Sequence, residues 1–87
     1  MNNFRSRIKK ASATKVFTNP NNGELTIELS NINNSKIAIT NVLGQIIKSQ
    51  KAELMNQINL NLFDKGIYFI NVMENNQSVY KGSMIKE

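Results

Sequence analysis

The stretch DKGIYFINV, residues 64–72, joins a tight turn to a dense β-strand. Gly66 stands where the chain needs a positive φ to reverse its direction. After it, apolar residues recur at every second position, the period of a strand with one buried face. That face holds Tyr68, Ile70 and Val72. Ile67 and Phe69 make the opposite face apolar as well, as is typical of a central or partly covered strand. The stretch therefore predicts a strand inside a β-sheet that is entered through a tight turn.

The same period of two continues along the chain from Val16 onward. Strict alternation of apolar and polar residues is typical of half-buried strands. We expect strands at 24–29, 36–40, 45–50, 57–62, 67–73 and 78–86. In the 45–50 segment, Ile46 and Ile47 are adjacent, so the pattern does not say which face points inward. The predicted core consists of Leu25, Ile27, Leu29, Ile37, Ile39, Ile58, Leu60, Leu62, Tyr68, Ile70 and Val72.

Turn residues separate these strands. The turn segments are NPNNG (19–23), SNINNS (30–35), LG (43–44), DKG (64–66) and ENNQ (74–77). Short strands with turns at roughly 8–12-residue spacing favour an all-β antiparallel sandwich. The segment KAELMNQ (51–57) is short and lies between strands, so we expect extended structure there rather than a helix. Gly82 within the last strand indicates an edge strand with a bulge.

The net charge of +5 comes from the first part of the chain. Residues 1–15 hold five of the 11 Lys and Arg residues and no acid, whereas Lys balances Asp and Glu in the rest. We therefore divide the chain into a basic linker or arm (1–15) and a β-domain (16–87). The arm lacks the apolar region of a secretory signal, and no apolar run is long enough to span a bilayer. We expect neither a signal peptide nor a transmembrane segment in this chain.

The sequence offers few groups for catalysis or metal binding. It has no Cys and no His, which removes most zinc ligands and the commonest general base. Glu24 and Glu28 share a strand face but would lie about 13 Å apart, wider than a glycosidase carboxylate pair. Asp64, the one Asp, sits in a turn, and no acidic cluster suits calcium. We therefore expect no enzymatic activity, no metal and no cofactor.

Two binding functions remain open on the residues alone. A carbohydrate-binding or adhesion module would need an exposed aromatic platform or a polar cleft, and few aromatic residues are spare for a platform. The basic arm could contact nucleic-acid phosphates non-specifically. Single-strand binders add stacking aromatics, whereas Tyr68 and Phe69 lie within the strand pattern. We therefore rank nucleic-acid binding last and expect no specific nucleic-acid partner.

Four stretches, taken in order, resemble one family, the type A C-terminal sorting domain of the type IX (Por) secretion system of Bacteroidota. They are VFTNPNNGELTIEL (16–29), ITNVLGQIIKS (39–49), LFDKGIYFINV (62–72) and SVYKGSMIKE (78–87). The residues that match the family motifs are Asn19, Pro20, Gly23, Asn41, Gly44, Gln45, Gly66, Tyr68, Val72, Lys81 and Lys86. Thr18 departs from the pattern, because the family has a first Pro there.

This resemblance implies a fold and a function. The fold would be a seven-stranded immunoglobulin-like sandwich, and the function a non-catalytic signal that directs an N-terminal cargo domain, absent from this chain, across the outer membrane. The implied partners are the outer-membrane translocon, the shuttle protein and the surface sorting peptidase of the type IX system. The implied location is the periplasm in transit and then the cell surface or the medium. The last strand, Val79 to Lys86, would be the surface that the machinery reads.

Overall fold

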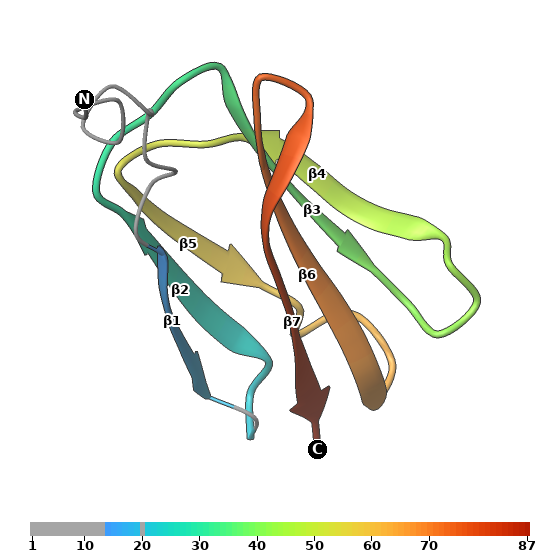
Figure 1. Cartoon of the computed structure of the whole chain (residues 1–87). Helices are drawn as coiled ribbons and strands as arrows, with labels where there is room; N and C mark the ends of the chain where they lie inside the picture. The colour runs from blue at the N-terminus through green and yellow to red at the C-terminus, as the bar shows by residue number, and fades with distance from the viewer. Residues whose placement is uncertain (1–13, 20) are drawn as a thin grey trace, which may run out of the picture.

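The computed structural model describes residues 14–19 and 21–87, whose strands are drawn in Figure 1. These strands are β1 (Thr14–Asn19), β2 (Glu24–Leu29), β3 (Ser35–Thr40), β4 (Ile46–Lys51), β5 (Met55–Asn59), β6 (Gly66–Glu74) and β7 (Gln77–Lys86). In this part of the chain the structure contains no helix: in the segment 51–57, Lys51 ends β4, residues 52–54 form a short connection with a bend, and residues 55–57 are extended in β5 as predicted. It follows that no described helix could cross a membrane. Most of the predicted arm, residues 1–13, and the motif residue Pro20 lie outside the described residues, whereas Thr14 and Lys15 belong to β1.

The strands form two antiparallel sheets that face each other as a sandwich (Figure 1). One sheet has the order β1-β2-β5 and the other the order β4-β3-β6-β7. In constant-type immunoglobulin domains the fourth strand joins the sheet of the first, second and fifth strands. Here β4 pairs with β3 instead. The predicted all-β antiparallel sandwich is thus confirmed, with its fourth strand in the larger sheet.

The core lies between the two sheets and follows the predicted alternation. Its buried apolar residues are Leu25, Ile27, Leu29, Ile37, Ile39, Ala52, Ile58, Leu60, Tyr68, Ile70, Val72 and Met84. Ten of the eleven predicted core residues are among them. The sequence pattern missed Ala52, Met84 and the buried Asn56. Asn56 holds the loop before β5, because its side-chain oxygen accepts a hydrogen bond from Glu53 N at 2.7 Å and its amide donates to Ile27 O at 3.1 Å.

Leu62 was predicted in the core, and this prediction is wrong: its side chain is 96% exposed. The alternation that ends at Leu60 stops because a turn follows β5. The side-chain oxygen of Asn59 accepts a hydrogen bond from Asn61 N at 2.7 Å, and Leu60 O accepts one from Phe63 N at 3.0 Å. This turn reverses the direction of Leu62, and Phe63 packs against the core instead.

The position of β6 in its sheet agrees with the prediction from its two apolar faces. It lies between β3 and β7. Its outer face is nevertheless solvent-accessible, with Ile67 43% exposed and Phe69 44% exposed. β6 has apolar residues on both faces because it is a central strand of the sheet, and among the described residues no further layer covers its outer face.

β7 is an edge strand, as predicted, and it contains a bulge, although not at Gly82. Gly82 pairs in register with Ile70, whereas the register shifts near Val79, where Val72 pairs with Tyr80 and Met73 with Ser78. A Cβ on Gly82 would lie 2.9 Å from ring carbons of Tyr80. The glycine therefore makes room for the Tyr80 ring, and the bulge has a separate origin.

A second register shift explains the adjacent isoleucines of β4. It falls between Ile39 and Thr40 on the partner strand and leaves Ile47 as the extra residue of β4. As a result Ile46 points outward and is 64% exposed, whereas Ile47 packs against the core. A bulge that re-aims side chains resolves the face that the sequence left open.

Candidate functional site

The first motif forms a tight turn between β1 and β2. Asn19 O accepts hydrogen bonds from Asn22 N at 3.3 Å and from Gly23 N at 3.0 Å. Gly23 is buried and has a φ of 71°, in the left-handed region that favours glycine. Its carbonyl oxygen accepts a hydrogen bond from Leu60 N at 2.8 Å. The turn is therefore tied to the chain that leaves β5.

Lys86 joins this turn to the third and fourth motifs. A Cβ at position 23 would lie 2.8 Å from Lys86 Cε, so the lysine stem passes directly over Gly23. The Lys86 ammonium group donates a hydrogen bond to Phe63 O at 2.9 Å, and Lys86 pairs in register with Gly66. One lysine thus bridges the two sheets and covers the end of the sandwich where these turns lie.

The second motif is a self-contained loop between β3 and β4. Asn41 Oδ1 accepts hydrogen bonds from Leu43 N and from Gln45 N, each at 3.0 Å. The Asn41 amide donates to Gln45 Oε1 at 2.9 Å. Gly44, with a φ of 83°, donates its N–H to Asn41 O at 3.0 Å. The three motif residues of this loop therefore hold one another in place.

The third motif closes the loop between β5 and β6. The Tyr68 side chain is buried, and its hydroxyl donates a hydrogen bond to the backbone oxygen of Asp64. A tyrosine bonded in this way to the backbone just upstream is the tyrosine corner of immunoglobulin-like sandwiches. A shallow depression is lined by this loop together with Asn41, Val42 and Leu43, so the second and third motifs are neighbours.

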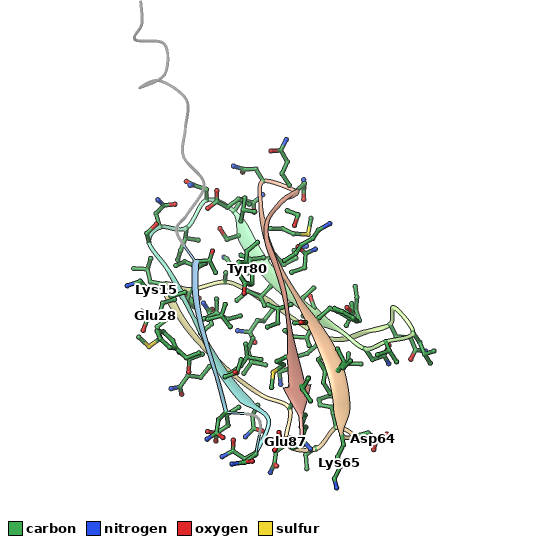
Figure 2. All side chains as sticks on the ribbon, turned by 60° about the horizontal axis from the view of Figure 1, so that its bottom comes forward. Lys15, Glu28, Asp64, Lys65, Tyr80 and Glu87 are labelled. Atoms are coloured by element: carbon green, nitrogen blue, oxygen red, sulfur yellow. The ribbon has the colours of Figure 1, made fainter. Side chains whose placement is uncertain are left out.

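The motif turns therefore gather at one end of the sandwich, which we name the motif end: residues 19 and 21–23, 41–45, 60–66 and 86. Figure 2 shows Asp64, Lys65 and Glu87 together there. Tyr68 reaches this end through its hydroxyl, and two other motif residues lie elsewhere. Val72 is fully buried in the core, and Lys81 is exposed on β7 opposite Asn71.

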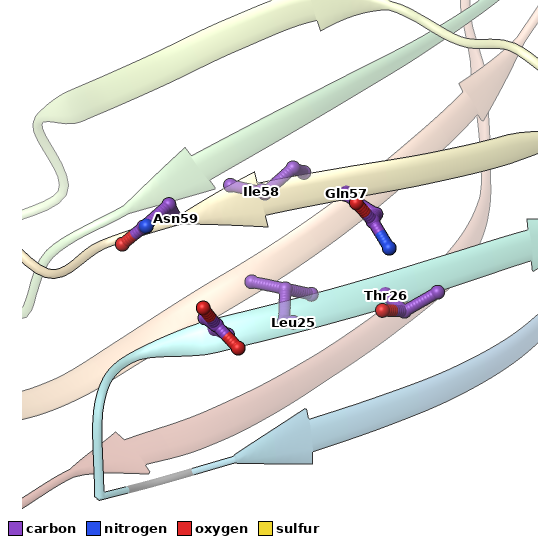
Figure 3. A pocket seen from close by; sticks show the side chains of 6 residues that line it. Leu25, Thr26, Gln57, Ile58 and Asn59 are labelled. Atoms are coloured by element: carbon purple, nitrogen blue, oxygen red, sulfur yellow. The ribbon is translucent and has the colours of Figure 1, made fainter.

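An open polar groove of about 510 Å³ lies on the three-stranded sheet, between β2 and β5. Thr26, Gln57 and Asn59 project from these two strands (Figure 3). Its one carboxylate, from Glu24, has no second acid or base beside it among the lining residues. In the described part of the chain, no three His, Cys, Asp or Glu side chains lie close enough together to hold a metal ion. The motif end is held by backbone and side-chain hydrogen bonds and by the half-buried side chain of Lys86.

The family model for the secretion system C-terminal sorting domain matches residues 15–86. The chain belongs to this family. It is also similar to the ulvan lyase NLR42 of Nonlabens ulvanivorans, with 33% identity over 79 residues. That match covers 88% of this chain and 15% of the lyase, so the sorting domain spans about 15% of the length of this relative.

Membership of this family confirms the resemblance drawn from the motifs. The sorting domain is a C-terminal signal for type IX secretion, it interacts with the machinery of that system, and it directs export to the cell surface or the medium. Sorting domains of this family are non-catalytic modules. The match favours sorting over the carbohydrate-binding or adhesion module that the sequence left open.

Proposed function

We propose that this sorting domain takes a cargo, joined to its N-terminal side through residues 1–15, across the periplasm and the outer membrane. Its partners are the outer-membrane translocon, the shuttle protein and the surface sorting peptidase. The domain contributes no catalysis of its own and acts by being recognised. The observation that supports this proposal is the convergence of the motif turns at one end of the sandwich.

The direction of β1 suits this arrangement. Thr14 pairs with Leu29, and β1 then runs toward Asn19 and the motif end (Figure 1). A cargo joined before β1 would therefore sit at the opposite end of the sandwich. The motif end would remain accessible to a receptor while the cargo is attached.

The last strand offers a second recognition element. Within the described residues β7 pairs with β6 alone, and its other edge, which β1 approaches, forms no ladder with another strand. An extended segment of a partner can add to such an edge by main-chain hydrogen bonds. We propose that the machinery reads Val79 to Lys86 in this way.

The motif residues have different tasks in this proposal. Most motif residues shape the turns of the motif end, namely Asn19, Gly23, Asn41, Gly44, Gln45, Gly66, Tyr68 and Lys86. Val72 supports these turns from the core. Lys81 is exposed and is available for direct contact. A lysine on an edge strand also blocks aggregation, and this alternative role must be separated by experiment.

The test uses the full chain behind a reporter with a Sec signal, in a Bacteroidota host with an intact type IX system. Three variants are compared with it: a deletion of residues 81–87, Lys81→Gln and Lys86→Gln. We expect the intact fusion at the surface or in the medium, and the deletion variant in the periplasm. Lys81→Gln should keep its melting temperature and export less, because only a direct contact is lost.

Lys86→Gln serves as the structural comparison. We expect it to lower the melting temperature, because the bridge from Lys86 to Phe63 O is lost. If the deletion variant is exported as well as the intact fusion, β7 is not the recognised element. If Lys81→Gln is exported normally, Lys81 only protects the edge. If the intact fusion stays in the periplasm, the sorting function itself is wrong for this chain.

A further inference from the structure

The outer face of the four-stranded sheet exposes several large apolar side chains near the motif end. We name this set the apolar face: Val42, Leu43, Ile46, Ile67, Phe69 and Ile85. Their exposed fractions range from 43% for Ile67 to 79% for Leu43. Single exposed apolar residues are ordinary, but a contiguous patch on a small domain usually marks an interaction site.

The strand registers show that these residues are contiguous. Ile67 pairs with Ile85 across β6 and β7. Phe69 pairs with Thr40, which pairs with Ile46, so these three side chains form the next row across the sheet. Val42 and Leu43 line one depression together with Ile67. The patch therefore reaches across the sheet from β4 to β7, with side chains from β4, β6, β7 and the second-motif loop.

The apolar face contains a depression of about 340 Å³ beside Phe69. The short side chains of Ala38 and Thr40 on β3 leave this space between Ile46 on β4 and Phe69 on β6. Met73 and Lys81 line it on the other side. Its size and apolar lining suit one inserted side chain of a partner better than a flat surface such as a membrane.

Charge identifies the kind of partner. By register, the outer face of this sheet carries Lys36, Lys51 and Lys81 and, among the described strand residues, no acid. The outer face of the other sheet carries Glu24 and Glu28 beside Lys15. Like charges facing each other disfavour a second copy of this chain that docks through the same face, whereas a segment rich in carboxylates would be attracted to it.

We propose that the apolar face docks an acidic protein segment of the type IX machinery. An apolar side chain of that segment enters the depression between Ile46 and Phe69, and its carboxylates lie near Lys36, Lys51 and Lys81. This inference rests on the proposed sorting function for the origin of the partner. The apolar face is a different surface from the backbone edge of β7 proposed above, and Lys81 belongs to both surfaces.

The first test measures docking without export. A synthetic peptide with one Phe flanked by Glu and Asp residues is titrated into the ¹⁵N-labelled full chain. We expect amide shifts at Ala38, Thr40, Ile46, Phe69 and Lys81. The shifts should weaken with salt and be absent with a peptide in which Lys replaces the acids. Shifts spread over both sheets, equal shifts with the Lys peptide, or no localised shifts would overturn the proposal.

Variants then connect docking to secretion. Ala38→Leu fills the depression, and Thr26→Leu places the same side chain on the outer face of the other sheet as a matched control. Lys36→Glu combined with Lys51→Glu reverses two exposed charges and needs no space, so it remains informative if Ala38→Leu does not fold. We expect both face variants to lose peptide binding and to reduce reporter export several-fold, with the control unchanged.

The outcomes separate the two proposals. If the intact fusion is exported and the folded face variants are exported equally well, the docking surface is wrong and the sorting function stands. If the intact fusion is not exported but the peptide binds at the depression and loses binding in Ala38→Leu, the face is a binding surface and the sorting function fails.

Discussion

At Gly23, both the backbone and the surrounding space exclude a side chain. Its φ is 71°, and a Cβ there would lie 2.8 Å from Lys86 Cε and 3.1 Å from the carbonyl carbon of Leu60. Gly44 has a similar φ of 83°, but no atom lies within 4 Å of the corresponding Cβ position. An alanine at Gly44 would be strained only by its backbone conformation, whereas an alanine at Gly23 would also clash with its neighbours. Comparing the two substitutions therefore measures the two costs separately.

We expect Gly44→Ala to reduce the free energy of unfolding by about 1–2 kcal/mol, the cost of a left-handed backbone for alanine. Gly23→Ala should reduce it by a further 1–3 kcal/mol or so, because the added methyl group overpacks the site. Chemical denaturation of both variants measures the difference. Equal losses would mean that the Lys86 stem moves aside without cost.

Some contacts of individual residues could not be predicted from the sequence. The motif pattern identified Gly23 and Lys86 separately, because each belongs to a different family motif. Their contact depends on the β6–β7 register and on the turn after β5, which no local pattern encodes. Asn56 was missed for a similar reason: a buried Asn is recognisable only once its hydrogen-bond partners Glu53 and Ile27 are in place.

Among the strands, the apolar–polar alternation assigned the inward face of β6 correctly, but after β5 it assigned Leu62 to the core wrongly. Alternation placed Tyr68, Ile70 and Val72 in the core correctly, because a period of two is a property of any strand with one buried face. The same alternation continued past the end of β5 to Leu62, since a turn and a strand can share a polar–apolar pattern. The bulges near Val79 and at Ile47 were not predicted at these positions because they depend on pairing.

The different burial of Ile70 and Leu62 predicts different effects of alanine substitution on the free energy of unfolding. Ile70 is 1% exposed and Leu62 is 96% exposed. We expect Ile70→Ala to reduce the free energy of unfolding by about 2–5 kcal/mol, a large part of the 5–15 kcal/mol typical of a whole domain. Leu62→Ala should change it by less than about 0.5 kcal/mol. Thermal melts compare the two, and a large loss in Leu62→Ala would show that its side chain packs in solution.

For the molecule as a whole, the fold class was accessible from the sequence and the sheet assignment of β4 was not. Short alternating strands and regular turns indicate a sandwich. Whether the fourth strand joins β3 or β5 depends on the connections on either side of it, and the alternation of β4 is compatible with both. The motif end was likewise not visible in the sequence, since its turns come from four separate segments.

We predict that removal of residues 1–13 leaves the melting temperature within a few degrees of the full chain. The core cluster is built from residues 16–84, and the predicted arm has few apolar residues to add to it. Circular dichroism during heating provides the measurement. Loss of a cooperative transition in the shortened chain would show that residues 1–13 contribute to folding.

The convergence of the turns at the motif end has a consequence for proofreading. Residues 23, 41–45, 63–66 and 86 are far apart along an unfolded chain and become neighbours only when both sheets have formed. A receptor that contacts two of these turns would read a conformational epitope rather than a linear peptide. Such a receptor would ignore chains whose tail is unfolded or truncated, and admission to the secretion pore would then depend on successful folding of the tail.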